Sequence, residues 1–204
     1  MNIWFVIWVF VATFILGTSV WSYAILLKQK RAWAIVAKKC ELRFTSNAIL
    51  KSPTLGGVFN GFEVDVFSDQ PISGKFREGG ARTIFQLSLP APMPTQGAMG
   101  SMAFKNFIDG LTVQEKFLGE GDLALGKDIY NKVKSKGLLA PYMTKERVAA
   151  LNAVLNIKTS PAILLFSPTE TLLRVESSEP FEDAARLEKF LTKLTEAAKI
   201  ISIT

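Results

Sequence analysis

The chain has 204 residues, of which 49% are apolar and 21% are charged, a composition typical of one folded domain with an appendage. It contains no histidine and one cysteine, which excludes histidine-based catalytic relays, histidine-ligated zinc, internal disulfides and CxxC redox pairs. Residues 28–43 carry +5 of the net charge of +6, so residues 44–204 carry only +1 and offer no basic face for nucleic acid. We therefore expect no catalytic residue, no cofactor, no metal ion and no nucleic-acid partner.

Residues 3–27 form an uncharged and mostly apolar segment. As a helix rising about 1.5 Å per residue, they extend roughly 37 Å, which exceeds the ~30 Å hydrocarbon core of a bilayer. Aromatic residues lie near both ends, where their rings favour the lipid headgroups: Trp4, Trp8, Trp21 and Tyr23. The positive charges follow this segment instead of preceding it, unlike those of a cleaved signal peptide. The pattern predicts a transmembrane helix over residues 3–27.

Residues 28–40 are basic and contain neither glycine nor proline, so we expect the helix to continue through them. Because lysine and arginine stay on the cytoplasmic side of a membrane, the segment predicts a single-pass protein of the cytoplasmic (inner) membrane. Its N-terminus would lie outside and its C-terminal domain in the cytosol. Two interpretations remain open: a lipid-surface contact, or a topology signal that continues into the first helix of the domain. In the first, the contact residues are Lys28, Lys30, Arg31, Trp33, Lys38 and Lys39.

Strand patterns open the cytosolic domain, which we assign to residues 41–204. Residues 56–67 place the turn dipeptide Asn60-Gly61 between two apolar-rich arms, and residues 82–89 alternate apolar and polar side chains. Together they predict an antiparallel meander with one buried face. Residues 90–101 are rich in proline, glycine and methionine and predict a loop, either an ordinary connection or a mobile docking surface.

The second half of the chain alternates strand and helix signals. We expect a strand over residues 111–118, a helix over residues 127–136 and a helix capped by Thr144 that ends at Asn156. Residues 162–167 and 171–177 predict a hairpin, and residues 180–201 a long amphipathic helix. Strands, helices, strands and a final helix indicate the α+β class, with one domain of antiparallel strands covered by helices.

Candidate chemistry is sparse. Residues 121–128 match the spacing G-x-x-x-x-G-K, but Asp128 occupies the place of the metal-binding hydroxyl, so we interpret them as a turn. Four acidic residues form a loose group without a calcium-loop or acid–base spacing: Asp109, Glu120, Asp122 and Asp128. Cys40 follows Lys38 and Lys39, whose charges lower the pKa of a thiol when they are close to it.

Taken together, these segments resemble uncharacterised bacterial single-span membrane proteins that have a small cytosolic α+β domain. The resemblance rests on the basic helix leading to CELRF, the hairpin of residues 56–67, the strand of residues 82–89, and the last hairpin with its long helix. It implies a location and a fold, and no activity.

We therefore expect a membrane-anchored, non-enzymatic accessory or scaffold protein that presents its cytosolic domain for protein–protein interaction. Its partners would be the lipid bilayer and either a membrane protein or further copies of itself. The alternative from another class is a membrane-bound ligand binder or enzyme with a site near residues 90–128. A third hypothesis is lipid sensing through the basic residues of the segment 28–39.

Overall fold

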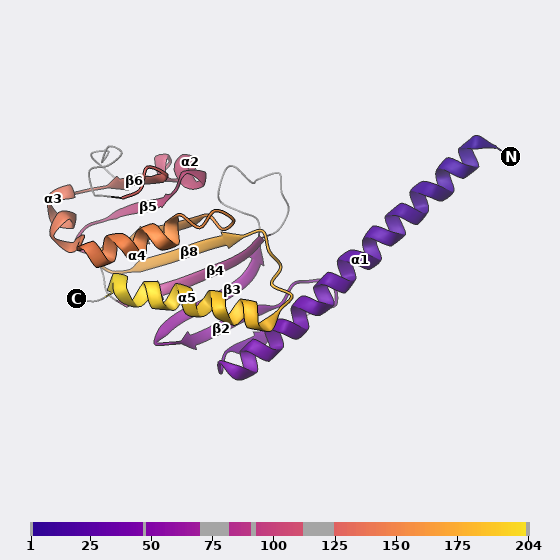
Figure 1. The fold of residues 1–204 in the computed structure, drawn as a ribbon, viewed down its shortest axis with the longest axis horizontal. Helices are drawn as coiled ribbons and strands as arrows, with labels where there is room; N and C mark the ends of the chain where they lie inside the picture. Colours follow the sequence, from indigo (N-terminus) through magenta and orange to yellow (C-terminus); the bar gives the residue numbers. More distant parts are fainter. Residues whose placement is uncertain (1, 47, 70–81, 91–92, 112–124, 203–204) are drawn as a thin grey trace.

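The computed structural model describes residues 2–46, 48–69, 82–90, 93–111 and 125–202. Over these residues a long helix, α1 (Ile3–Lys39), leads into a domain built on an eight-stranded antiparallel sheet (Figure 1). The strands are β1 (Arg43–Thr45), β2 (Thr54–Phe59), β3 (Phe62–Asp69), β4 (Arg82–Leu89), β5 (Gly97–Ser101), β6 (Ile129–Val133), β7 (Ala162–Phe166) and β8 (Thr171–Ser177). The α+β class is thus confirmed, with a long apolar N-terminal helix followed by a domain of antiparallel strands and helices.

The sheet has the order β1-β2-β3-β4-β8-β7-β5-β6. The first four strands form the predicted meander, and β8 joins β4 to the second half of the sheet. The hairpin of β2 and β3 turns at Asn60 (φ 52°) and Gly61 (φ 85°), where a positive φ favours asparagine and glycine. The predicted hairpin of β7 and β8 is also present.

One face of the sheet carries the main core. Alternate side chains of β3, β4 and β8 point into it, and it is covered by α4 (Lys145–Leu155), α5 (Ala184–Ser202) and the C-terminal part of α1 (Figure 1). Three phenylalanine rings, Phe85, Phe181 and Phe190, join β4 to α5 with centroids 4.7–5.2 Å apart. Burying one such ring contributes roughly 1.5–3 kcal/mol, so this cluster is a main attachment of α5 to the sheet.

A smaller cluster lies on the opposite face. The short helices η2 (Met102–Phe104) and α2 (Lys105–Asp109) bring Phe104 and Ile108 against Ala98 and Ile163 of β5 and β7. Two more short helices, α3 (Lys136–Leu139) and η3 (Ala140–Tyr142), connect β6 to α4. The strands β5 and β7 are therefore covered on both faces, by η2 and α2 on one and by α4 on the other.

The prediction of a helix over residues 127–136 is wrong, because these residues contain the strand β6. Their burial alternates, with Ile129, Asn131 and Val133 buried and Tyr130 and Lys132 only half-buried. Pairing with β5 supplies hydrogen-bond partners for the backbone N–H and C=O groups of this segment. This pairing overrides the helical spacing of its side chains.

The prediction of a continuous loop over residues 90–101 is wrong in its second part, which forms β5. A Cβ atom at Gly97 would lie 2.7 Å from the carbonyl oxygen of Lys132 and 2.8 Å from the ring of Phe166. The small residues therefore mark close strand packing and not a loop. The predicted strand 111–118 lies outside the described residues except for Leu111.

Thr144 is the predicted N-cap of α4, and its hydroxyl accepts a hydrogen bond from the backbone N–H of Arg147 at 3.3 Å. We expect Thr144→Ala to lower the free energy of unfolding by about 1 kcal/mol, because that donor loses its partner. For a chain of this size, thermal unfolding should then shift down by roughly 2–4 °C. Thr144→Ser keeps the hydroxyl and should leave the transition unchanged. Equal transitions for the alanine variant and the unchanged chain would contradict the cap.

Candidate functional site

The helix α1 changes character along its length. From residue 3 to residue 24 every side chain except Ala12 is exposed, and nearly all of this surface is apolar. The helix is long and apolar enough to cross a membrane. These 22 residues extend roughly 33 Å, about the thickness of the hydrocarbon core. An apolar surface of this extent marks an interaction site, and its dimensions match those of a bilayer.

The second part of α1 belongs to the domain. Ala32, Trp33, Val36 and Ala37 are buried in the main core, and this part of α1 packs against α5. The helix continues from its exposed end to its buried end without interruption. One continuous helix therefore joins the exposed apolar segment to the core of the domain (Figure 1).

Ion pairs reinforce this attachment at its surface. The ammonium of Lys39 lies 2.8 Å from the carboxylate of Glu188, and that of Lys28 lies 3.9 Å from Glu182. Since both lysines are largely exposed, solvent screening weakens each ion pair, and the buried side chains dominate the attachment.

The prediction that Trp33 contacts lipid is wrong. Its side chain is fully buried in the core, because it lies on the face of α1 that packs against the domain. Lys28, Arg31, Lys38 and Lys39 are exposed and Lys30 is half-buried. The contact of these five residues with lipid stays a prediction, while the continuation of the basic segment into a domain helix is observed.

Cys40 is the C-cap of α1, is half-buried and has a free thiol. Burial raises the pKa of the Cys40 thiol, and the nearby carboxylate of Glu188 raises it further. The charge of Lys39 lowers the pKa of this thiol, as expected, but burial and the carboxylate of Glu188 outweigh it. The thiol is protonated at neutral pH and is a poor nucleophile.

This environment predicts slow alkylation of Cys40. Because the native pKa lies above that of the unfolded chain, the pH midpoint of the reaction with iodoacetamide should be higher in the folded protein than in denaturant. Rates measured across a pH series in both states test this expectation. A folded midpoint at or below the denatured one would contradict the effect of burial.

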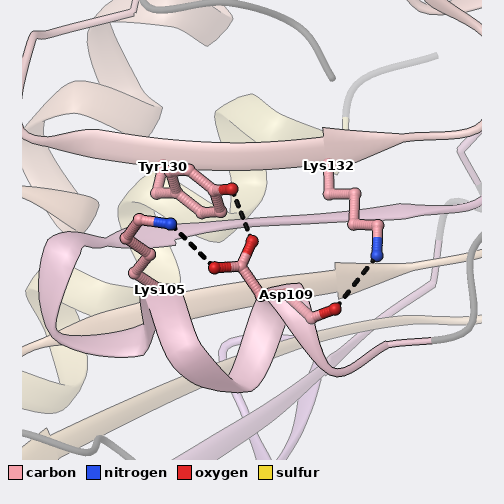
Figure 2. Close-up of polar contacts among 4 residues, drawn as sticks. All are labelled: Lys105, Asp109, Tyr130 and Lys132. Carbon is pink, nitrogen blue, oxygen red and sulfur yellow. Dashed lines mark hydrogen bonds and ion pairs between the residues drawn. The ribbon is translucent and has the colours of Figure 1, made fainter. Parts of the chain in front are cut away.

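A polar cluster joins α2 to β6 at the end of the domain remote from the N-terminal end of α1 (Figures 1 and 2). The carboxylate of Asp109 accepts hydrogen bonds from Lys105 Nζ at 2.7 Å and from the Tyr130 hydroxyl at 2.5 Å. Lys132 Nζ donates to the carbonyl oxygens of Asp109 and Leu111 at 3.2 and 2.7 Å. The ammonium of Lys105 also lies 4.4 Å from the centre of the Tyr130 ring.

Electrostatics explain what this cluster does. The hydrogen bonds from Lys105 and Tyr130 lower the pKa of the Asp109 carboxyl, so it remains ionised. Burial and the Asp109 carboxylate raise the pKa of Tyr130, so its hydroxyl remains a donor. The polar groups of the cluster are hydrogen-bonded to one another, and these bonds hold α2 against β6. It presents neither a free base nor an activated nucleophile.

The predicted acidic group is only partly within the described residues. Asp109 is held by Lys105 and Tyr130, while Glu120 and Asp122 lie outside the described residues, as do residues 121–124 of the glycine motif. At Gly126 the backbone N–H donates to the side-chain oxygen of Asn152 at 2.8 Å, which ties this segment to α4. In the part of the chain that the structure describes, no three acidic or cysteine residues group as they would around a metal ion.

A cavity of about 740 Å³ lies near the predicted alternative site, at the ends of β4, β5, β7 and β8. Its described lining mixes apolar and polar side chains, and Glu170 is the one ionisable residue within that lining. Pro90, Gln96 and Leu111 contribute to it, so it touches the region that the sequence singled out. The volume falls in the range of small-molecule sites.

Comparisons with known proteins show the fold and no family. Neither a protein-family model nor a curated protein matches the chain. Among solved structures it is similar to the crystal structure of the mycobacterial trehalose monomycolate transport factor A, TtfA, with a TM-score of 0.51 and 11% sequence identity. The alignment covers 85% of this chain and 94% of the chain in that structure. At this identity it is a likeness of fold.

Proposed function

We propose that this chain is a non-enzymatic accessory protein of the cytoplasmic membrane, which presents its α+β domain on the cytosolic side to a membrane protein or to further copies of itself. One observation carries the proposal. A single unbroken helix is apolar and exposed over residues 3–24 and is buried in the domain core from Ala32 onward. Such a helix holds a folded domain at a set distance from a bilayer.

The charge pattern supports the orientation. Lys28, Lys30 and Arg31 follow the apolar segment directly. Because basic residues are retained in the cytosol, the domain would lie inside and the N-terminus outside.

The chemistry of the domain supports a role without catalysis. The chain has no histidine, its one thiol is protonated, and the polar cluster of Asp109 is satisfied from within. The similar fold of a protein described as a transport factor agrees with an accessory role at a membrane.

Isolation of the full chain from its native membrane tests the proposal. A C-terminally tagged chain, extracted in mild detergents, should retain a stoichiometric membrane-protein partner or assemble with itself. A C-terminal reporter should be active only in the cytosol. A matched variant in which residues 3–24 are replaced by an unrelated apolar span shows whether the domain or the span makes the contact. A monomer without partners in every detergent, or a reporter active outside the cytosol, would overturn the proposal.

The alternative function is a membrane-bound binder of a small ligand, or an enzyme acting on one, and the cavity of about 740 Å³ favours it. Its mixed lining, with Ser88, Glu170 and Leu172, suits a small molecule that has both apolar and polar parts. Thermal-shift screening of the full chain would identify such a ligand by a rise in the unfolding temperature. The variant Ser88→Trp, which fills the cavity from an exposed position on β4, should abolish that rise.

A further inference from the structure

Two large aliphatic side chains stand exposed on the connection between β1 and β2. Ile49 and Leu50 are 74% and 78% exposed, more than any other large apolar side chain in the described residues, those of the apolar segment of α1 included. Their connection reaches α1 at Lys30, in the C-terminal third of that helix. The Nζ of Lys30 donates hydrogen bonds to the carbonyl oxygens of Ala48 and Ile49 at 2.7 and 2.9 Å, which holds the connection against α1.

The position of Leu50 along α1 sets its depth. Leu50 lines a cavity of about 380 Å³ between α1 and the domain, together with Ser22, Tyr23 and Leu26. These helix residues lie at the cytosolic end of the exposed apolar segment, where Trp21 and Tyr23 mark the level of the headgroups. With the proposed anchoring, Ile49 and Leu50 would therefore lie at the inner surface of the bilayer, and not at the end of the domain that faces the cytosol.

We infer that Ile49 and Leu50 enter the cytoplasmic leaflet beside α1 and form a second contact between this protein and the lipid. The inference rests on the proposed membrane anchoring. Charge complementarity supports lipid as the occupant, because Lys30 and Lys51 flank the two aliphatic side chains and Lys28 and Arg31 lie on the adjacent helix. Apolar side chains between lysines are the pattern of segments that lie in an anionic lipid surface.

A second contact would determine the orientation of the domain. The tilt of a lone transmembrane helix is set by its interfacial anchors and its neighbours. A contact displaced from the axis of α1 restricts that tilt, and α1 transmits the restriction because it enters the core without a break. The domain would then present one defined face to the cytosol.

Fluorescence of the full chain in vesicles tests this contact. In a Cys40→Ser background, Ile49→Cys or Leu50→Cys carries an environment-sensitive fluorophore, in phosphatidylcholine vesicles that contain phosphatidylglycerol. The control is Leu138→Cys, which is 57% exposed on α3 at the end of the domain remote from the N-terminal end of α1. All three sites are exposed, so labelling leaves the core intact, which circular dichroism verifies.

We expect the label at positions 49 and 50 to be quenched several-fold more by brominated acyl chains than the label at 138. Aqueous iodide should quench position 138 more strongly. Iodide quenching at 50 equal to that at 138 would overturn the inference. So would protection from iodide without quenching by brominated lipid, because a protein would then cover the site.

Vesicle flotation separates this inference from the proposed function. A chain that fails to float with the vesicles contradicts the anchoring itself. A chain that floats while positions 49 and 50 remain open to iodide contradicts only the second contact.

Discussion

Replacing Trp33 with alanine is expected to lower the free energy of unfolding by about 3–5 kcal/mol, the cost of truncating a large buried aromatic side chain. Its indole is fully buried where α1 packs on the domain. Because α1 packs here against α5 and β1, whose backbones are held in the fold, we expect the cavity that alanine leaves to close only in part. The variant would also loosen the attachment of α1 to the domain, because Trp33 is the largest side chain that α1 buries.

Thermal unfolding of the full chain in detergent, followed by circular dichroism, measures this effect. The transition should fall by roughly 6–20 °C. Trp21→Ala is the matched control, since Trp21 lies on the same helix but is 72% exposed, and its loss should leave the domain unchanged. Equal transitions for the two variants would show that the buried end of α1 contributes nothing to the domain.

Introducing two arginines at the centre of the exposed apolar segment should prevent stable membrane insertion. Val11 and Phe14 lie midway along residues 3–24 and are both exposed. Each arginine at the centre of a bilayer costs about 2.5–3.5 kcal/mol, so the pair opposes insertion by about 5–7 kcal/mol. The core of the domain is untouched, because neither side chain contributes to it.

Membrane fractions washed with alkaline carbonate test this expectation. The unchanged chain should remain in the washed membranes, and Val11→Arg with Phe14→Arg should be lost from them. Ile35→Arg is the matched control, since Ile35 is 59% exposed on the same helix but lies beyond the apolar segment. Retention of the double variant at the level of the control would contradict a transmembrane anchor.

Elements set by local chemistry were predictable from the sequence. Asn60-Gly61 tolerates the positive φ of its hairpin, and Thr144 supplies the oxygen that caps α4. The long uncharged segment likewise predicts an apolar helix at the N-terminus, because its composition is decisive over many turns. In each case the residues that give the signal lie within, or directly beside, the element that they predict.

Elements that depend on distant partners were not predictable. Gly97 indicates a loop by composition, and only the approach of Lys132 and Phe166 explains why a strand needs glycine there. Residues 129–133 carry a weak helical spacing that pairing with β5 overrides. The sequence predicts that the last helix begins at Pro180, whereas α5 begins at Ala184, because Phe181 first enters the core with a positive φ.

The candidate membrane site was likewise predictable from the sequence only in part. The sequence alone determined an apolar segment of bilayer length followed by lysines and arginines, because length and charge are properties of the residues themselves. Only the tertiary structure decided that Trp33 is buried in the core and that Ile49 and Leu50 stand beside α1. Burial and depth depend on which surfaces meet, and the contacts with α5 and the hydrogen bonds of Lys30 join residues that are separated along the chain.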